Sequence, residues 1–406
     1  MSTTPTVSRD LLRKIESARA RTDELFELLM PAALYSRPIP ERHRLIFYLG
    51  HLEAFDWNQV CRNALDIPSF HPEFDHLFEF GIDPPVGKAP LDQPSDWPSE
   101  EAVRAYNQRI RTILDEVLEQ APEQIVNVAL EHRLMHAETL AYLLHNLPYN
   151  QKSPVHMDPI HASPGPILSM IAIPGGQATL GQKAGEFGWD NEFDEHQVAV
   201  PDFAISKYKV TNGEYLHFVR EGGEVPNFWL ERDGEWFYRG MFAEVPLPHN
   251  APVYVTHARA SAYARWAGKA LPTEAQFHRA AYGTRSSEER VYPWGDAAPE
   301  ARQGNFHFHY WDPIDVQASP AGDSAFGASQ LVGNGWEWTS TPFGPFPGFQ
   351  PFPFYPGYSK NFFDEAHYVM KGASPRTAAC FLRRSFRNWF RPDYPYVYVS
   401  FRLVDN

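Results

Sequence analysis

A proline-rich stretch divides this sequence into two parts of different character. Prolines recur between Leu147 and Pro166, which is typical of a linker. Before this stretch, apolar residues recur at three- and four-residue spacing, as on one face of a helix. After it, the chain shows short strand-like runs, many glycines and loops rich in Trp, Tyr and Phe. Because 406 residues suffice for two cores of ordinary size, we predict one domain over 1–160 and another over 161–406.

The first part carries four helical patterns. They cover residues 9–29, 44–64, 99–117 and 123–145. The polar segment 67–99, which contains prolines, is predicted to be a loop between the second and third helices. Four helices of this length indicate an antiparallel bundle, and bundles commonly build metal sites from facing helices. In the second part, amphipathic helices are expected at 258–267 and 274–281.

The composition argues against several classes of partner. The formal net charge of −14 disfavours binding to nucleic acid or to anionic membranes. There is no run of about eighteen apolar residues, so no transmembrane helix is expected, and the N-terminus lacks the basic-then-apolar pattern of a signal peptide. The cysteines are Cys61 and Cys380 alone, which rules out a disulfide framework and fits a cytoplasmic protein in a reducing environment.

Three histidines form the most informative chemical pattern. His132 and His136 are four residues apart in a predicted helix, so both imidazoles face the same side, one turn apart. His51, from another helix, would complete a facial set of three nitrogen ligands and leave other positions open. Neutral imidazoles suit Fe, Zn, Cu or Ni, so the set alone does not identify the metal. The alternative interpretation is two surface histidines and one capped core histidine.

Six motifs of the second part follow one another in an order that is known from one family. They are 173–176 (Ile-Pro-Gly-Gly), 189–192 (Trp-Asp-Asn-Glu), 210–215 (Val-Thr-Asn-Gly-Glu-Tyr), 265–274, 292–295 (Tyr-Pro-Trp-Gly) and 333–338 (Gly-Asn-Gly-Trp-Glu-Trp). Together they resemble the formylglycine-generating, sulfatase-modifying family, which implies an irregular α+β fold of C-type-lectin kind. Formylglycine formation in that family uses a pair of cysteines, and only Cys380 lies in this part. We therefore do not expect that activity, and we expect 333–338 to support the fold.

A helical domain placed before this fold resembles the non-heme iron sulfoxide synthases of ergothioneine biosynthesis. The helical domain is of DinB type, and Glu138 and Thr139 continue its histidine motif. The resemblance implies that His51, His132 and His136 bind Fe(II) as the cofactor. It also implies an O₂-dependent reaction that joins a chalcogen to C2 of the imidazole of hercynine, which is trimethylhistidine. Iron suits this reaction because redox-inert zinc does not activate O₂.

Two C-terminal segments resemble the family's substrate-binding parts. By position, Tyr355 matches the family's proton donor and Tyr358 matches its hercynine contact. A phenol with a pKa of about 10 suits proton donation to O₂ as it is reduced. Asn388 and Trp389 match the segment that receives the trimethylammonium group, a cation recognised by ring faces and carbonyl oxygens. The alternative is that the tyrosines and Trp389 only pack.

Three positions depart from the family's pattern, and we assign them to substrate binding. Phe390 stands where users of γ-glutamylcysteine have Asp, Met135 where Gln is frequent, and Phe55 where a hercynine-contacting Gln is usual. The paired tyrosines of cysteine-using relatives are also missing, with Phe-Glu-Phe at 78–80 instead. A pocket for an amino-acid thiol is therefore not visible in the sequence.

Residues 41–58 bear on the chalcogen donor. This segment differs from the form usual in ergothioneine enzymes and looks more like the selenoneine synthases, which join a selenosugar to hercynine. We therefore expect C–Se bond formation, with C–S bond formation to cysteine or γ-glutamylcysteine as the alternative. Two hypotheses of other classes remain open: a lectin-like module that binds a sugar or peptide without catalysis, and a zinc thiol-transferase that works without O₂.

Overall fold

The chain forms two compact units. The computed structural model describes residues 7–82, 90–153, 155, 165–166, 168–286 and 288–405. The first unit is Met1–Val155 and the second is His156–Asn406. The predicted boundary between 160 and 161 lies outside the described residues, so its position stays a prediction.

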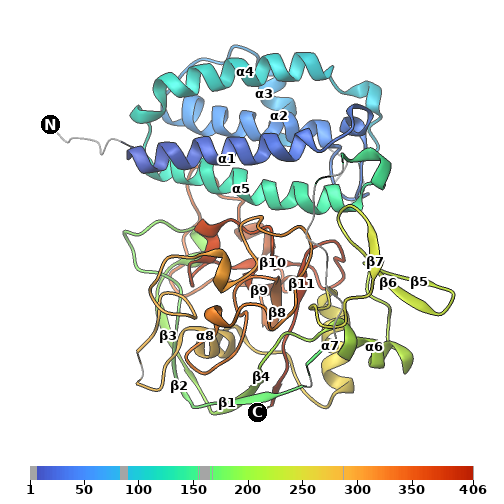
Figure 1. The fold of residues 1–406 in the computed structure, drawn as a ribbon. Coiled ribbons are helices and arrows are strands. Elements are labelled where there is room, and N and C mark those ends of the chain that lie inside the picture. Colours follow the sequence, from blue (N-terminus) through green and yellow to red (C-terminus); the bar gives the residue numbers. More distant parts are fainter. Residues whose placement is uncertain are drawn as a thin grey trace. The chain divides into compact units, whose positions relative to one another are not determined.

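The first unit is a helical bundle, as predicted (Figure 1). Its α-helices are α1 (Arg9–Glu27), α2 (Leu45–Asp56), α3 (Pro72–Phe80), α4 (Glu100–Val117) and α5 (Glu123–Asn146). A π-helix, η2 (Trp57–Ala64), directly continues α2, and the short 3₁₀ turns are η1 (Pro31–Tyr35), η3 (Pro94–Asp96), η4 (Leu118–Gln120) and η5 (Tyr149–Gln151). Helix α1 packs on α5, and α2 packs on α3, α4 and α5. Helix α2 is therefore the central element of the bundle.

The central position of α2 follows from its sequence. Every residue of α2 is buried, so this helix has no solvated face. By contrast, α1 and α4 bury one apolar stripe each and begin at serine N-caps, since Ser8 accepts a hydrogen bond from Leu11 N and Ser99 accepts one from Ala102 N. Any polar side chain on α2 must consequently find its partner inside the bundle.

The prediction of a continuous loop over 67–99 is wrong, because α3 lies within it. Pro72 occupies the first helical turn, where its missing N–H costs nothing, and His71 caps the helix by accepting from Phe74 N. Asp75 anchors α3 to the bundle, since its buried carboxylate accepts hydrogen bonds from Trp57 and Tyr106 at 3.1 and 2.7 Å. The proline that suggested a loop therefore starts a helix.

The second unit is an irregular α+β structure, as predicted from the resemblance. Three sheets are antiparallel: β1 (Met170–Ile173), β4 (Phe203–Ser206) and β12 (Val404–Asp405); β2 (Gly176–Leu180) and β3 (His196–Val200); and β5 (Trp229–Arg232), β6 (Glu235–Arg239) and β7 (Glu244–Pro246). The fourth sheet has the order β10 (Asn388–Phe390), β9 (Tyr368–Ala373), β8 (Gly335–Pro342) and β11 (Val399–Ser400), and β11 runs parallel to β8. In this sheet Trp389 pairs with Val369, which fixes where β10 presents its side chains.

Helices and turns complete the second unit. The α-helices are α6 (Asn212–Arg220), α7 (His257–Trp266) and α8 (Glu274–Tyr282), and the 3₁₀ turns are η6 (Asp190–Glu192), η7 (Ala301–Gln303), η8 (Pro320–Gly322), η9 (Lys360–Phe362) and η10 (Ala379–Leu382). The two predicted helices correspond to α7 and α8, whereas α6 was not predicted although it begins with a capping box formed by Thr211 and Glu214. The 333–338 motif lies in the core, with Glu337 accepting from buried Lys209 and Arg402.

Within the described part of the chain, no helix is long and apolar enough to span a bilayer. Cys61 and Cys380 are free thiols that lie in different units.

Candidate metal centre

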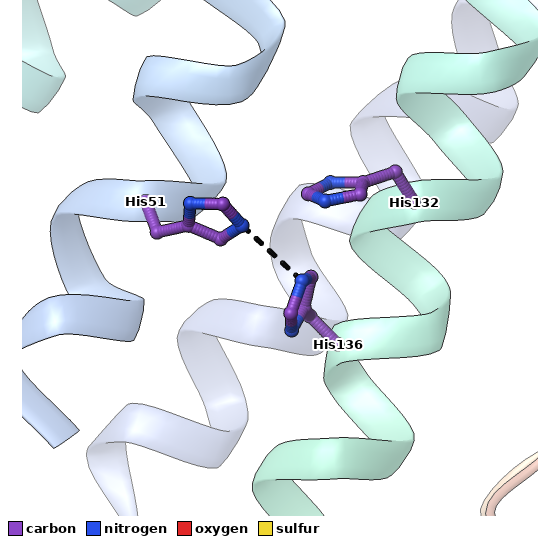
Figure 2. A group of neighbouring side chains, drawn as sticks. All are labelled: His51, His132 and His136. Carbon is purple, nitrogen blue, oxygen red and sulfur yellow. Dashed lines mark hydrogen bonds between the residues drawn. The ribbon is translucent and has the colours of Figure 1, made fainter. Parts of the chain in front are cut away.

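Helices α2 and α5 bring the three predicted histidines together. His51 projects from α2, and His132 and His136 project from α5, so that the three rings face one another (Figure 2). Each ring offers one nitrogen, and these three nitrogens lie within 4.8 Å of one another. His51 and His132 are buried and His136 is half-buried. The interpretation as two surface histidines is therefore wrong.

A backbone carbonyl orients His51. Nδ1 of His51 lies 2.6 Å from the carbonyl oxygen of Phe78 on α3. Because a carbonyl only accepts, Nδ1 must carry the hydrogen, and Nε2 then has a free lone pair. This Nε2 points at Nε2 of His136 at a distance of 3.2 Å (Figure 2). Gly50 permits the approach of α3, since a Cβ there would collide with the Phe78 ring.

Burial keeps all three imidazoles neutral at physiological pH. Desolvation lowers the pKa of His51 to about 4. Desolvation also lowers the pKa of His132 and of His136 well below the ordinary value, and neighbouring histidines add to the effect in both cases. Neutral imidazole is the form that ligates a metal. The donor set thus fits a divalent first-row transition metal such as iron, although three imidazoles also suit zinc.

The Nδ1 atoms of His132 and His136 also bear on this fit. Among the described residues, Nδ1 of His132 and Nδ1 of His136 are buried without a hydrogen-bond partner. Buried polar atoms in native structures are usually satisfied by protein, water or an ion. The orphaned Nδ1 of His136 is not the nitrogen that meets Nε2 of His51, so the fit to a metal rests on the converging nitrogens, one from each ring.

Aromatic side chains from α2 cover two of the rings. Phe55 stacks on His132 with ring centroids 3.4 Å apart and planes 10° apart. Phe47 stacks on His51 at 4.7 Å, and Tyr48 lies 5.6 Å from His136. Since these residues lie on the same helix as His51, α2 carries one candidate ligand and also packs against a candidate ligand of α5. The substrate-binding role that we predicted for Phe55 stays a prediction, and its observed contact is with His132.

A buried ion cluster joins α2 to α5 beside the histidines, and the sequence patterns did not predict it. Arg133, next to His132, donates to Glu53 at 2.8 Å and to Asp56 at 2.6 Å, and all three residues are buried. Arg111 of α4 also donates to Glu53. Burial alone would raise the pKa of Glu53, but the two guanidinium groups outweigh it and lower this pKa to about 2. Charged residues inside apolar helices were the available signal.

Met135 lies on α5 directly before His136 and is half-buried. Its carbonyl oxygen accepts a hydrogen bond from Thr139 at 3.2 Å, a contact within the helix. A substrate contact by the Met135 side chain stays a prediction.

Three of the predicted catalytic and substrate residues form one aromatic cluster in the second unit. The Tyr355 and Tyr358 rings lie 5.8 Å apart, and Trp389 lies edge-on to Tyr358 at 5.4 Å. On its other side Trp389 stacks on Phe343 at 4.1 Å. Tyr355, Tyr358 and Trp389 are all half-buried, so each keeps some ring surface in contact with solvent. The substrate roles of these residues stay predictions.

Asn388 and Phe390 flank Trp389 on β10 and have local contacts. Oδ1 of Asn388 accepts a hydrogen bond from the Trp389 backbone at 2.9 Å, and Phe390 stacks on Tyr394 at 5.0 Å. Both side chains are half-buried. The assignment of these two residues to substrate binding also stays a prediction.

Comparison with known proteins covers nearly all of the chain. Residues 14–145 match the DinB superfamily, and residues 158–406 match the sulfatase-modifying factor enzyme 1-like domain. A hercynine oxygenase of Mycolicibacterium smegmatis is 32% identical over 98% of this chain and 99% of its own length. The chain belongs to the hercynine oxygenase family. Another hercynine oxygenase, from Mycolicibacterium thermoresistibile, is 34% identical over 97% of this chain and 94% of its own length.

The chain is also similar to a longer protein. Ergothioneine biosynthesis protein 1 of Neurospora crassa is 26% identical over 93% of this chain, which spans 55% of that protein. The chain thus matches nearly the full length of the two Mycolicibacterium proteins and about half of the fungal relative.

Proposed function

We propose that this protein is an Fe(II)- and O₂-dependent oxidoreductase that acts on hercynine. One observation carries the proposal: a chain that matches hercynine oxygenases over nearly its full length also places three neutral imidazoles around a common point. The three histidines would hold the iron, and bound iron would supply the redox chemistry that O₂ activation needs. Zinc would fit the same donors without supplying that chemistry.

The hercynine side of the reaction is assigned to the aromatic cluster of the second unit. The Trp389 ring and the Asn388 carbonyl oxygen would receive the trimethylammonium group, which offers a charge but no hydrogen-bond donor. Tyr358 would contact the rest of hercynine, and the Tyr355 phenol would donate a proton as O₂ is reduced. The half-buried state of these side chains suits both roles, since a fully buried residue would not be open to substrate.

We propose a selenosugar as the chalcogen donor. Phe390 stands where users of γ-glutamylcysteine have Asp, Met135 stands where Gln is frequent, and Phe55 stands where a hercynine-contacting Gln is usual. In the reaction, C2 of the imidazole and the chalcogen each give up one hydrogen and form the new bond. O₂ takes up these hydrogens as water and leaves its second oxygen on the chalcogen. The oxidation of the two substrates and the reduction of O₂ then balance.

The second candidate is C–S bond formation with cysteine or γ-glutamylcysteine. The names of the relatives favour it, because they refer to hercynine and to ergothioneine biosynthesis. The stoichiometry is the same for both donors, so only the identity of the chalcogen distinguishes the two reactions.

Parallel incubations test the proposal. The protein would be supplied with Fe(II), O₂, hercynine and either a 1-seleno-sugar, cysteine or γ-glutamylcysteine, with mass spectrometry of the products. We expect a hercynine selenoxide from the selenosugar, and a sulfoxide as the main product would favour the second candidate. A His132→Ala control should contain no stoichiometric iron. Turnover without O₂ would support a zinc thiol-transferase, and a protein that holds no iron and gives no product would support a binding module.

A further inference from the structure

The segment from Trp189 to Glu192 contacts the two tyrosines of the aromatic cluster and the chain that leads to Trp389, although it lies far from both in sequence. Trp189 caps η6 and stacks on the Tyr358 ring, with centroids 3.9 Å apart and planes 24° apart. Trp189 also approaches Tyr355 edge-on at 6.5 Å. Since Trp189 is fully buried, its ring provides a fixed surface that both tyrosine rings contact.

Asp190 binds the residue that follows Tyr358. Oδ1 of Asp190 accepts a hydrogen bond from Ser359 Oγ at 2.5 Å, and both side chains are buried. Burial raises the pKa of Asp190, while hydrogen bonds from Ser359 and from the backbone of Phe352 oppose the rise. The carboxylate thus anchors the loop of residues 352–362 that carries both tyrosines (the tyrosine loop) at Ser359, directly after Tyr358. A hydrogen bond to a buried charged group is among the stronger ones in proteins.

The other end of the segment holds the chain that leads into β10. Glu192 accepts hydrogen bonds from Arg383 at 2.5 Å and from Ser385 at 2.6 Å. Arg387 donates to the Asn191 carbonyl oxygen at 3.4 Å, one residue before β10 begins. The short η6 turn therefore connects the tyrosine loop to the strand that carries Trp389.

We propose that Asp190 is a positioning residue, which acts through Ser359 to set where Tyr355 and Tyr358 stand relative to Trp389. The consequence for hercynine rests on the proposed function, whereas the placement of the loop does not. Loss of either partner should leave the rings present but less well oriented, so that substrate binding and the coupling of O₂ reduction to product formation both suffer.

The test is a double-mutant cycle with Asp190→Ala and Ser359→Ala in the full-length protein. We expect each single variant to weaken hercynine binding by about tenfold, and the double variant to be no weaker than the single ones, because each change removes the same hydrogen bond. Asp190→Asn retains an acceptor oxygen and should fall between Asp190→Ala and the parent. If Asp190→Ala does not fold, Ser359→Ala and Asp190→Asn still decide the question.

Ser206→Ala provides the matched control. Ser206 is buried in the same unit and accepts a hydrogen bond from Leu403 N at 3.1 Å, away from the cluster. Ser206→Ala should not affect hercynine binding. The double variant of Ser206→Ala and Asp190→Ala should therefore bind hercynine as Asp190→Ala alone does. Additive effects of Asp190→Ala and Ser359→Ala on hercynine binding would overturn the proposal, because the two residues would then act separately.

Hydrogen exchange separates this inference from the proposed function. The backbone amides of Tyr355, Tyr358 and Phe362 donate within the tyrosine loop, so their exchange reports its order without any substrate. Faster exchange at these amides in both single variants, but not in Ser206→Ala, is expected. Unchanged exchange would overturn the positioning role. A parent protein that binds no hercynine would instead contradict the proposed function and leave the exchange result to decide the inference.

Discussion

Replacement of Arg133 by Met should strongly destabilise the helical bundle. The guanidinium of Arg133 is 1% exposed and neutralises Glu53 and Asp56, whose side chains are 2% and 4% exposed. Methionine has a similar length but no charge, so two carboxylates would stay buried without this partner. Removal of one partner from a buried ion pair costs about 3–5 kcal/mol. Since Arg111 still pairs with Glu53, we expect the lower end of that range.

Hydrogen exchange of the α2 and α5 amides would measure this loss as a free energy of opening, with urea denaturation as a second measurement. Arg104→Met is the matched control, because Arg104 is 56% exposed and pairs with Glu100 on the surface of α4. Its free energy of unfolding should change by less than about 0.5 kcal/mol. A change below about 1 kcal/mol in Arg133→Met would refute the idea that the ion cluster holds α2 against α5.

The buried ion cluster also predicts how the stability of the folded protein changes at low pH. Although burial opposes it, the pairing with Arg133 and Arg111 lowers the pKa of Glu53 from 4.5 to about 2. A carboxylate with a lower pKa in the folded state contributes stability that is present above its unfolded pKa and is lost as the pH falls through the folded pKa. The contribution of Glu53 should therefore be lost between about pH 4.5 and 2, and Arg133→Met should lose less of it. Asp56 acts in the opposite direction, because burial raises its pKa. Equal pH profiles would contradict this account.

Three predictions concern the proposed chemistry. Replacement of any one of the three histidines by Ala should abolish turnover and stoichiometric iron while circular dichroism stays unchanged; a variant that keeps both would remove that residue from the ligand set. Trp389→Ala should weaken hercynine binding by up to about thirtyfold in a calorimetric titration. Equal binding of histidine and hercynine by the parent would contradict recognition of the trimethylammonium group by Trp389. Tyr355→Phe should still bind iron and hercynine, but it should form the coupled product about 10²–10⁴-fold more slowly and give more oxidised donor. Tyr358→Phe should instead weaken hercynine binding and leave the ratio of coupled product to oxidised donor unchanged.

Local signals predicted much of the fold. Ser99 marks the start of α4, the residue after Pro122 starts α5, and both agree with the structure because caps and prolines act over three or four residues. The four-residue spacing of His132 and His136 likewise predicted that they share a face of α5. The same reasoning did not predict helix α3, because Pro72 is compatible both with a loop and with a first helical turn. Only the buried contacts of Asp75 distinguish the two.

The environment of the candidate sites depends on contacts that no spacing rule contains. Ser359 and Asp190 are 169 residues apart, and Arg133 and Glu53 are 80 residues apart, yet each pair forms a buried hydrogen bond. In both cases the predicted site residue, Tyr358 or His132, is the immediate neighbour of a residue that makes the long-range contact. A charged or hydroxyl side chain directly beside a candidate site residue, in an otherwise apolar segment, is therefore a signal that the sequence does hold. It indicates where the chain is anchored, while the identity of the distant partner emerges only from the packed structure.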